Sequence, residues 1–207
     1  KLFIFKNNFY KTKNKIIHSF DFLNFSNKLG GKVGINLSKK SIFGWYKINK
    51  NKLGFPWSED LSSRRLINLL YNYEYINSSS KIIDKRKLDF IIYFHIQRIL
   101  FDFNSKKISR ISSFDLIAYL LSCAITKKIS DKNIAYIKHI AENQIDKLGM
   151  HKSYNILEHS KFINNLNEIK SILLFFKINN ANIFDKLILK MTSISNEYFH
   201  KDGSLPL

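Results

Sequence analysis

Long apolar segments with helical spacing, separated by short polar turns, dominate the chain from residue 81 onward. Between residues 81 and 103 the apolar side chains occupy more than one helical face, and the segment 110–129 is also largely apolar. A helix that is apolar on several faces must be covered by neighbours on more than one side. Short turns between consecutive helices require antiparallel packing. The sequence therefore predicts an all-α domain built from antiparallel helical hairpins.

Capping and turn residues predict where the helices begin and end. Ser58 is the predicted N-cap of one helix, with two acidic residues in its first turn. Ser112 or Ser113 caps the helix that follows residue 110, and a further helix starts at Ser130 and ends at Gly149. The remaining predicted helices span 32–49, 81–103, 156–178 and 183–199. The pattern indicates about seven helices and no strand.

Three regions are expected along the chain. Residues 1–31 contain many phenylalanines at irregular spacing, which predicts an irregular N-terminal segment, and residues 32–199 form the helical domain. Residues 200–207 resemble the entry to another element, so we expect a linker to a further domain. Because the first residue is Lys1, we expect a fragment of a longer chain.

The formal net charge of +18 indicates an anionic partner, such as nucleic acid, anionic lipid or an acidic polysaccharide. The lysines are scattered singly or in pairs, as an AT-rich genome would place them, and no arginine-rich helix occurs. Nucleic acid is therefore disfavoured and an acidic sugar polymer is favoured. The apolar run 116–125 is too short for a transmembrane segment. The sequence does not indicate an oligomeric state.

Cys123 is the one cysteine, which excludes an internal disulfide and a cysteine-based zinc site. It lies in an apolar run, so we expect a buried, inert thiol. The chain has no nucleophile elbow, P-loop, zincin helix or dinucleotide fingerprint, which argues against several common enzyme classes. We predict no cofactor and no metal site in this segment.

The junction between residues 144 and 159 is the first candidate site, because polar and ring-bearing side chains crowd around a glycine between two helical patterns. If a helix begins near Asn155, then Asn155, Glu158 and His159 share one face. A histidine and a carboxylate can exchange protons, and a tyrosine such as Tyr154 can act as base and acid. In the alternative interpretation, Asn155 caps the helix, Glu158 strengthens the cap, and His151 and His159 are surface residues.

The second candidate site is the segment Phe55-Pro56-Trp57 with the following Arg64 and Arg65. Aromatic rings stack on the apolar faces of sugars, and arginine pairs bidentately with a carboxylate or sulfate. In the alternative interpretation, Trp57 fixes the loop to the core while the arginines cap the helix or extend along its surface.

Three segments, in this order, resemble the helical part of the heparinase II/III-like family, and most closely a bacterial branch that carries a β-sandwich after this domain. Residues 57–68 (WSEDLSSRRLIN) resemble its tryptophan and arginine-bearing helix. Residues 142–155 (ENQIDKLGMHKSYN) resemble its turn between helices, and residues 199–205 (FHKDGSL) resemble the stretch that leads to the β-sandwich.

The resemblance implies an incomplete (α/α) toroid and a β-sandwich that lies outside this chain. It leaves open whether that β-sandwich holds a structural metal. It also implies a polysaccharide lyase that cleaves a uronic-acid polymer by β-elimination, and a periplasmic or cell-envelope location. In such lyases one side chain neutralises the C6 carboxylate, a tyrosine or histidine removes the C5 proton, and an acid protonates the leaving oxygen. On this basis the expected catalytic residues are His159, His151 and Asn155, and the expected substrate-binding residues are Trp57, Arg64, Arg65 and Tyr154.

The chain departs from the family pattern at three places. Glu158 and His159 stand where characterised lyases carry a Tyr-His pair, Leu148 replaces an aspartate, and residues 111–121 lack the expected Asn-His signature. An alternative is therefore a non-catalytic protein that binds glycans or assembles envelope polysaccharides on the same scaffold. A third hypothesis is an unrelated helical interaction domain with a basic surface.

Overall fold

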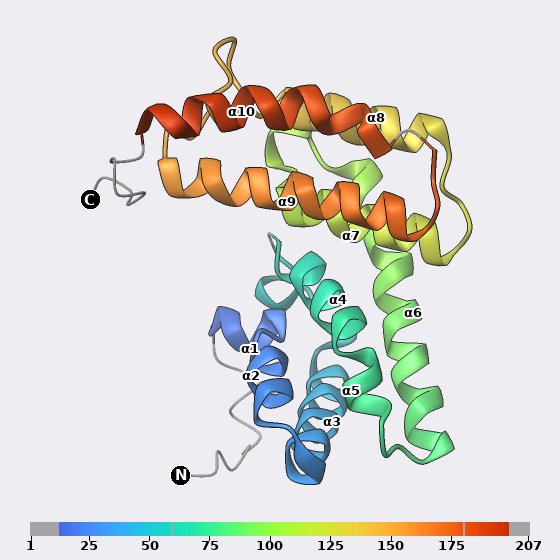
Figure 1. Cartoon of the computed structure of the whole chain (residues 1–207). Helices are drawn as coiled ribbons and strands as arrows, with labels where there is room; N and C mark the ends of the chain where they lie inside the picture. The colour runs from blue at the N-terminus through green and yellow to red at the C-terminus, as the bar shows by residue number, and fades with distance from the viewer. Residues whose placement is uncertain (1–12, 59, 180, 199–207) are drawn as a thin grey trace. The chain divides into compact units, whose positions relative to one another are not determined.

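The computed structural model describes residues 13–58, 60–179 and 181–198. These residues form ten α-helices and three short 3-10 helices, and they contain no strand beyond one isolated β-bridge between Ile145 and His151 (Figure 1). The predicted all-α class is therefore confirmed. The segment 200–207, predicted as a linker, lies outside the described residues.

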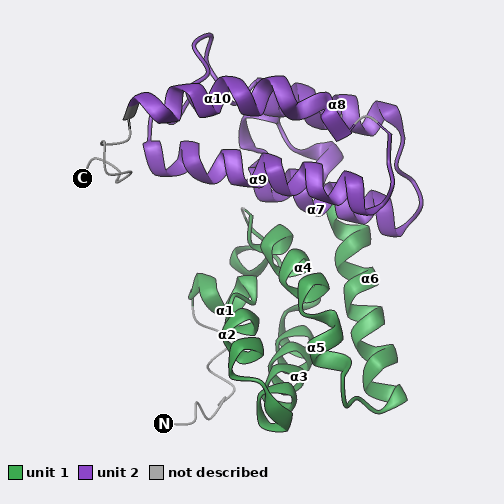
Figure 2. Cartoon of the chain, viewed as in Figure 1, with its two compact units in different colours: residues 1–101 green, residues 102–207 purple. Residues whose placement is uncertain are grey.

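The chain forms two compact units, Lys1–Phe101 and Asp102–Leu207 (Figure 2). The boundary falls inside one long helix, α6 (Ile82–Ser105). The sequence predicts one helical domain over 32–199 and does not indicate this division, because the apolar spacing continues through the boundary.

Unit 1 consists of short helices packed around α4 (Leu61–Tyr71). The central helix contacts its neighbours α1 and α2, the 3-10 helix η2 and the following α5. The longer α3 contacts α2 and α5. The bounds of these elements are α1 Lys15–Ser19, α2 Phe22–Leu29, α3 Gly31–Asn49, η2 Phe55–Trp57 and α5 Tyr73–Asn77.

Amide side chains join α2 to α4 in a continuous ladder. Asn24 donates to Asn68 Oδ1 (3.2 Å), and Asn72 donates to Asn24 Oδ1 (3.1 Å). Asn27 donates to Asn72 Oδ1 (3.0 Å), and Asn68 continues the ladder to Asp21 Oδ1 (2.8 Å). Asn68 and Asn72 are buried, so the ladder satisfies polar groups that would otherwise destabilise the interface.

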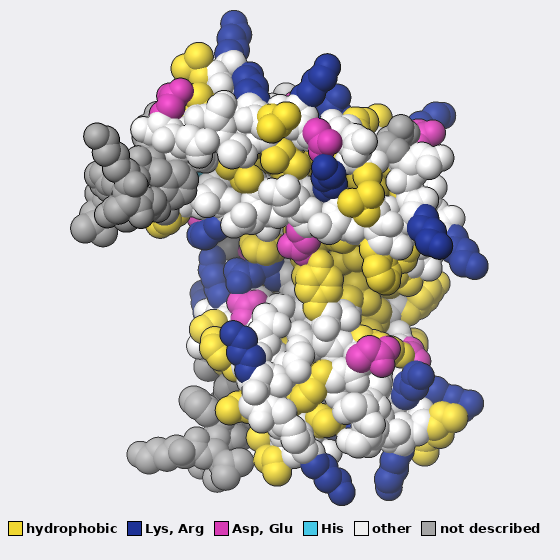
Figure 3. All heavy atoms as spheres, viewed as in Figure 1, with side chains coloured by type: hydrophobic (Ala, Val, Ile, Leu, Met, Phe, Trp, Pro, Cys, Tyr) yellow, Lys and Arg dark blue, Asp and Glu magenta, His cyan; other side chains and the backbone are white. Residues whose placement is uncertain are grey.

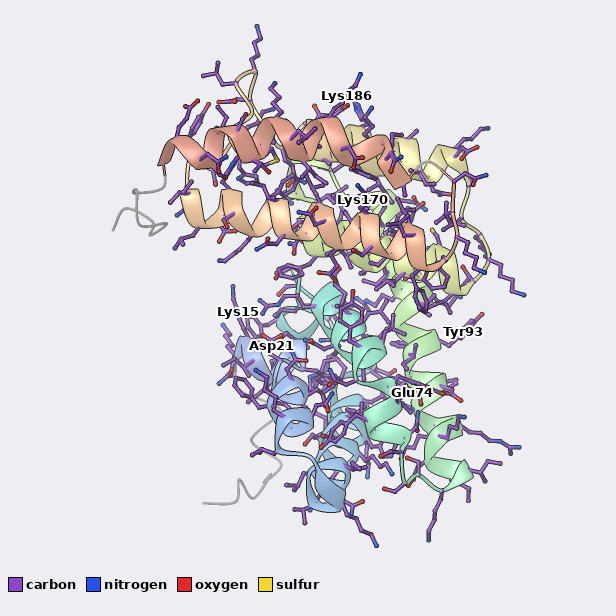
Figure 4. The ribbon with its side chains drawn as sticks, viewed as in Figure 1. Lys15, Asp21, Glu74, Tyr93, Lys170 and Lys186 are labelled. Atoms are coloured by element: carbon purple, nitrogen blue, oxygen red, sulfur yellow. The ribbon has the colours of Figure 1, made fainter. Side chains whose placement is uncertain are left out.

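Unit 2 consists of four longer helices. The central helix α9 (Ile156–Phe175) lies between α7 and α10 and contacts both, and α7 also contacts α8. Figure 1 shows α9 and α10 side by side, and the pair Lys170–Asp185 (2.7 Å) joins α9 to the first residue of α10 (Figure 4). The other elements are η3 Ile108–Arg110, α7 Ser113–Ile125, α8 Asp131–Glu142, η4 Ala181–Phe184 and α10 Asp185–Tyr198.

The most buried helix of unit 2, α7, begins at a complete capping box. Ser112 Oγ accepts the N–H of Asp115, and the Asp115 carboxylate accepts the N–H of Ser112. From Asp115 to Ala124 every side chain of α7 is buried, including the thiol of Cys123. Burial raises the pKa of this thiol, which agrees with the expected inert cysteine.

Three boundaries differ from the predictions. The irregular segment predicted over 1–31 is wrong for residues 15–29, which contain α1 and α2. The Asn14 side chain caps α1, and the Phe20 ring is buried in the core. Ser58 is not an N-cap, since its hydroxyl donates to Phe55 O and the helix begins at Leu61. The helix from Ser130 ends at Glu142, not at Gly149, because a folded loop follows.

Candidate functional site

The loop between α8 and α9, residues 143–155, is a compact hairpin that protrudes from unit 2 (Figure 1). Asp146 N–H donates to Met150 O (2.9 Å), and Lys152 N–H donates to Gln144 O (2.9 Å). The Asp146 carboxylate accepts the backbone N–H groups of Leu148, Gly149 and Met150 at 2.8–2.9 Å. Burial acts to raise the pKa of Asp146, but these three hydrogen bonds together with Lys190 lower it overall.

Gly149 allows the loop to rest on α10. Its φ is +110°, and an added Cβ would lie 2.9 Å from Lys190 Cγ and 3.1 Å from Lys190 O. Lys190 Nζ donates to Lys147 O (2.7 Å), and Gln144 Nε2 donates to Ile111 O (2.7 Å) next to α7. The loop is thus fixed to two helices of its own unit.

His159 is fully buried under this loop, and both of its ring nitrogens are engaged. Nδ1 accepts the backbone N–H of His151 (3.1 Å), so the ring proton lies on Nε2, which donates to Met191 O (3.0 Å). His159 therefore joins α9, the loop and α10 as a neutral imidazole. In this arrangement neither nitrogen is directed toward solvent, which suits a structural role better than the expected proton transfer.

His151 is half-buried, and its ring packs 5.2 Å from the ring of Phe162. Its Nδ1 accepts the N–H of Ser153 (3.2 Å) and lies 2.8 Å from the Ser153 hydroxyl. Nε2 makes no hydrogen bond with any described residue. Burial lowers the pKa of His151, Glu158 acts to raise it and His159 to lower it, with a net decrease. A neutral His151 thus carries its ring proton on Nε2, a donor that no described residue engages.

Tyr154 is the most unusual residue of the loop. Its backbone has φ +51°, a left-handed conformation that costs a non-glycine residue free energy, and its side chain is 71% exposed. The N–H of Tyr154 donates to His151 O (2.8 Å), which holds this conformation. The surrounding hydrogen bonds therefore hold the backbone of Tyr154 in this conformation, and its ring is exposed at the loop.

Asn155 is the N-cap of α9, as the alternative interpretation of the sequence proposed. Its Oδ1 accepts the N–H groups of Leu157 (2.9 Å) and Glu158 (3.2 Å). Glu158 lies in the first turn and pairs with Lys161 (2.7 Å) at the surface. The structure thus brings His151, Tyr154 and Asn155 of the loop close to His159 at the start of α9. Tyr154 and Asn155 are exposed, His151 is half-buried and His159 is buried.

Arg65 lies in the core of unit 1, not at a surface. Its guanidinium lies 3.9 Å from the ring centroid of Trp45 and 4.5 Å from that of Trp57, and its Nε donates to His95 Nε2 (2.8 Å). Nη1 donates to His18 O and to Pro56 O, and Nη2 has no partner among the described residues. No described carboxylate pairs with it. Burial and, to a lesser degree, Arg98 lower its pKa well below the ordinary value.

Trp57 also belongs to this core. It is 7% exposed, and its Nε1 donates to Asn49 O (2.9 Å). Arg64 is half-buried and pairs with Asp21 (2.5 Å) and Asp60 (3.9 Å) (Figure 4). Trp57, Arg64 and Arg65 therefore stabilise unit 1, and the two sets of predicted site residues lie in different units.

Asp146 and His95 also shape these regions, and only Asp146 was not singled out from the sequence. Asp146 organises the loop, and its signal was an aspartate three residues before a glycine, a common loop pattern. His95 accepts from Arg65 and donates through Nδ1 to Ile91 O (2.7 Å); burial first, then Arg65, lowers its pKa well below the ordinary value. A lone histidine within an apolar helical segment predicts a hydrogen-bonded core or rim residue, and His95 is such a core residue.

Comparison of the chain with protein-family models, with curated proteins and with solved structures gives no match. Within the described part of the chain, no three His, Cys, Asp or Glu side chains are grouped as metal ligands. None of the helices in that part has the length and apolar character that a membrane crossing needs.

Proposed function

We propose that this chain is the helical part of a heparinase II/III-like protein of the periplasm or cell envelope, an incomplete (α/α) toroid that acts on an acidic polysaccharide. The loop 143–155 is its contact with the polymer. Tyr154 would stack on a sugar ring, and His151 would donate from Nε2 to a carboxylate or hydroxyl oxygen. The exposed ring of Tyr154, on a backbone that a hydrogen bond holds in a left-handed conformation, is the observation that carries this proposal.

Binding is the role that the loop geometry supports best. Stacking is favoured by an exposed ring on an ordered loop, because ordering a mobile segment costs free energy on binding. The bonds of Asp146, the close contact at Gly149 and the link through His159 order the backbone of this loop. Lys147 and Lys152 are exposed on the same loop and supply positive charge for an anionic polymer.

Cleavage by β-elimination is the second candidate function, and the Ser153 hydroxyl favours it. Removal of a C5 proton requires a base with a free lone pair. His151 Nε2 would supply one if the ring proton moved to Nδ1. Nδ1–H would then donate a hydrogen bond to the Ser153 hydroxyl at 2.8 Å, and the bond from Ser153 N–H to Nδ1 would be lost. The lowered pKa of His151 keeps the ring neutral near pH 7, as a base must be.

Binding of purified chain to polygalacturonate, alginate and heparin, with neutral dextran as reference, tests the proposal. Tyr154→Ala should weaken binding by about tenfold, the equivalent of roughly 1.4 kcal/mol. Phe175→Ala, which removes an equally exposed ring from the end of α9, should leave binding unchanged. Equal effects of the two variants, or no binding to any acidic polymer, would contradict the proposed function.

Release of unsaturated uronates, followed by ultraviolet absorbance, separates the two candidates. If the chain cleaves an acidic polymer and His151→Gln abolishes cleavage but retains binding, the lyase candidate stands. Binding without any release of product supports the non-catalytic role.

A further inference from the structure

Positive charge is concentrated in unit 1, although lysine is not. Residues 1–101 contain 15 lysines and residues 102–207 contain 14, as expected if genome composition sets the lysine content of both halves. The two halves differ in their numbers of arginines and of acidic residues. The first half has 19 basic against 6 acidic residues, a charge of +13, and the second has 15 against 10, a charge of +5. Codon bias toward lysine cannot produce this difference.

Within unit 1, α3 combines several lysines with a complete lack of acidic residues. Lys32, Lys40 and Lys47 are exposed and lie on one face of the helix. Successive members are about two turns apart, roughly 11 Å along the axis. The ion pairs found among the described residues involve no lysine of α3. The three lysines are therefore exposed to solvent and have no ion-pair partner among the described residues.

Aromatic rings of α3 and α6 lie between these lysines. Phe43 falls between Lys40 and Lys47 on the same face, and Lys87 Nζ of α6 lies 4.4 Å from its ring centroid. Tyr46 meets Phe90 of α6 edge to face, with ring centroids 6.2 Å apart. Phe90 is 59% exposed. These contacts bring α3 and α6 together in one surface of alternating charge and ring.

We propose that this basic–aromatic face binds an anionic polysaccharide at a site separate from the loop of unit 2. The inference rests on the proposed function for the class of polymer, and on the charge of unit 1 for the place. Lysine ammonium groups pair with carboxylates or sulfates, and exposed ring surfaces cover the apolar faces of sugars. The face consists of Lys40, Phe43, Tyr46 and Lys47 of α3 with Lys87 and Phe90 of α6.

The geometry favours a sugar polymer over a single-stranded nucleic acid. Base binding uses splayed aromatic platforms and arginine planes. Here Tyr46 is half-buried and meets Phe90 and Phe94 at 89° and 82°, so the three rings do not form parallel platforms between which bases could stack. The six residues of the face include no arginine. A row of separate ammonium charges suits a chain that carries one anionic group on each of many sugars.

Binding to heparin and polygalacturonate, with neutral dextran and an oligothymidylate as references, tests the inference. The triple variant Lys40→Gln, Lys47→Gln, Lys87→Gln should weaken polysaccharide binding by about tenfold, since each exposed charge contact contributes a factor of roughly two to five. It should also make the affinity less sensitive to salt. Phe90→Ser, which retains every charge, should weaken binding to a smaller degree.

The matched control is Lys128→Gln, Lys132→Gln, Lys186→Gln, three exposed positions of unit 2 (Lys186 is marked in Figure 4) that give the same change in net charge. Equal weakening in both triple variants would overturn the inference, because net charge alone would then explain binding. Polymer binding that is lost in Tyr154→Ala but unchanged in the unit 1 variant would overturn the inference and retain the proposed function. Binding of the oligonucleotide alone would overturn both.

Discussion

Replacing His159 by leucine separates a structural histidine from a catalytic one. The change keeps a similar volume but removes the acceptor for His151 N–H and the donor to Met191 O. Each buried polar group left without a partner costs about 1–3 kcal/mol. Because His159 is fully buried and the N–H of His151 only partly so, we expect a loss of roughly 2–5 kcal/mol in the free energy of unfolding.

Urea denaturation measures this loss as a lower midpoint at an unchanged slope. The control is His139→Leu, an exposed histidine on α8, which should change stability by less than about 0.5 kcal/mol. A loss below roughly 1 kcal/mol in His159→Leu would refute the reasoning, because the two hydrogen bonds would then contribute little. Retained stability with lost cleavage of an acidic polymer would return His159 to the catalytic role that the family resemblance implies.

Three further changes probe the same structural features. Gly149→Ala should destabilise the chain by roughly 1–3 kcal/mol in urea denaturation. Its φ of +110° is strained for alanine, and the new Cβ would meet Lys190. Gly54→Ala is the control that measures backbone strain alone, because Gly54 has φ +88° but open space around the added Cβ. Arg65→Lys should cost roughly 2 kcal/mol and change the tryptophan fluorescence, since an ammonium cannot stack on Trp45 and Trp57 as a planar guanidinium does; unchanged stability would contradict a stacking role. The pKa of His95 is lowered in the folded state. The contribution of the neutral His95 to the free energy of unfolding is therefore complete above the unfolded pKa of about 6.5 and is lost as pH falls below it. Denaturation between pH 7 and pH 5 should show a fall in stability that is smaller in His95→Gln.

Figure 3 shows why the surface alone gives little guidance to function. On the visible face, lysines and arginines occur among uncharged side chains, some singly and some in groups, and hydrophobic side chains are exposed both singly and in patches. Twenty large hydrophobic residues are exposed in the described part of the chain, so an exposed ring is not in itself a site. What distinguishes Tyr154 from Phe175 is its backbone conformation and the hydrogen bonds around it.

Helical periodicity predicted the fold class and most helices, because each long helix buries a continuous stripe. Ser112 and Asn155 were recognisable as caps, since a cap depends only on residues three positions away. The helices of residues 15–29 were missed because their stability comes from contacts with α4, such as the bond from Asn68 to Ser19 O. Short helices of this kind are marginal without tertiary packing.

The sequence predicted the position of the candidate site better than the roles of its residues. Sequence spacing placed His151, Tyr154 and His159 in one junction, and the structure brings them together. Spacing could not show which ring is buried, because that depends on α10, more than 30 residues further along the chain. The same limit applies to Arg65, whose position among Trp45, Trp57 and His95 joins four separate segments.

The amide ladder between α2 and α4 constrains how unit 1 can evolve. Hydrogen bonds join Asn24 to Asn68 and Asn72, and Asn27 to Asn72. Changing any one of these residues therefore leaves an amide group without its hydrogen-bond partner. Sliding α2 by one turn would break every rung at once, which fixes its register on α4. We expect these four positions to change jointly among related chains, either all toward amides or all toward apolar residues, and single exchanges to be rare.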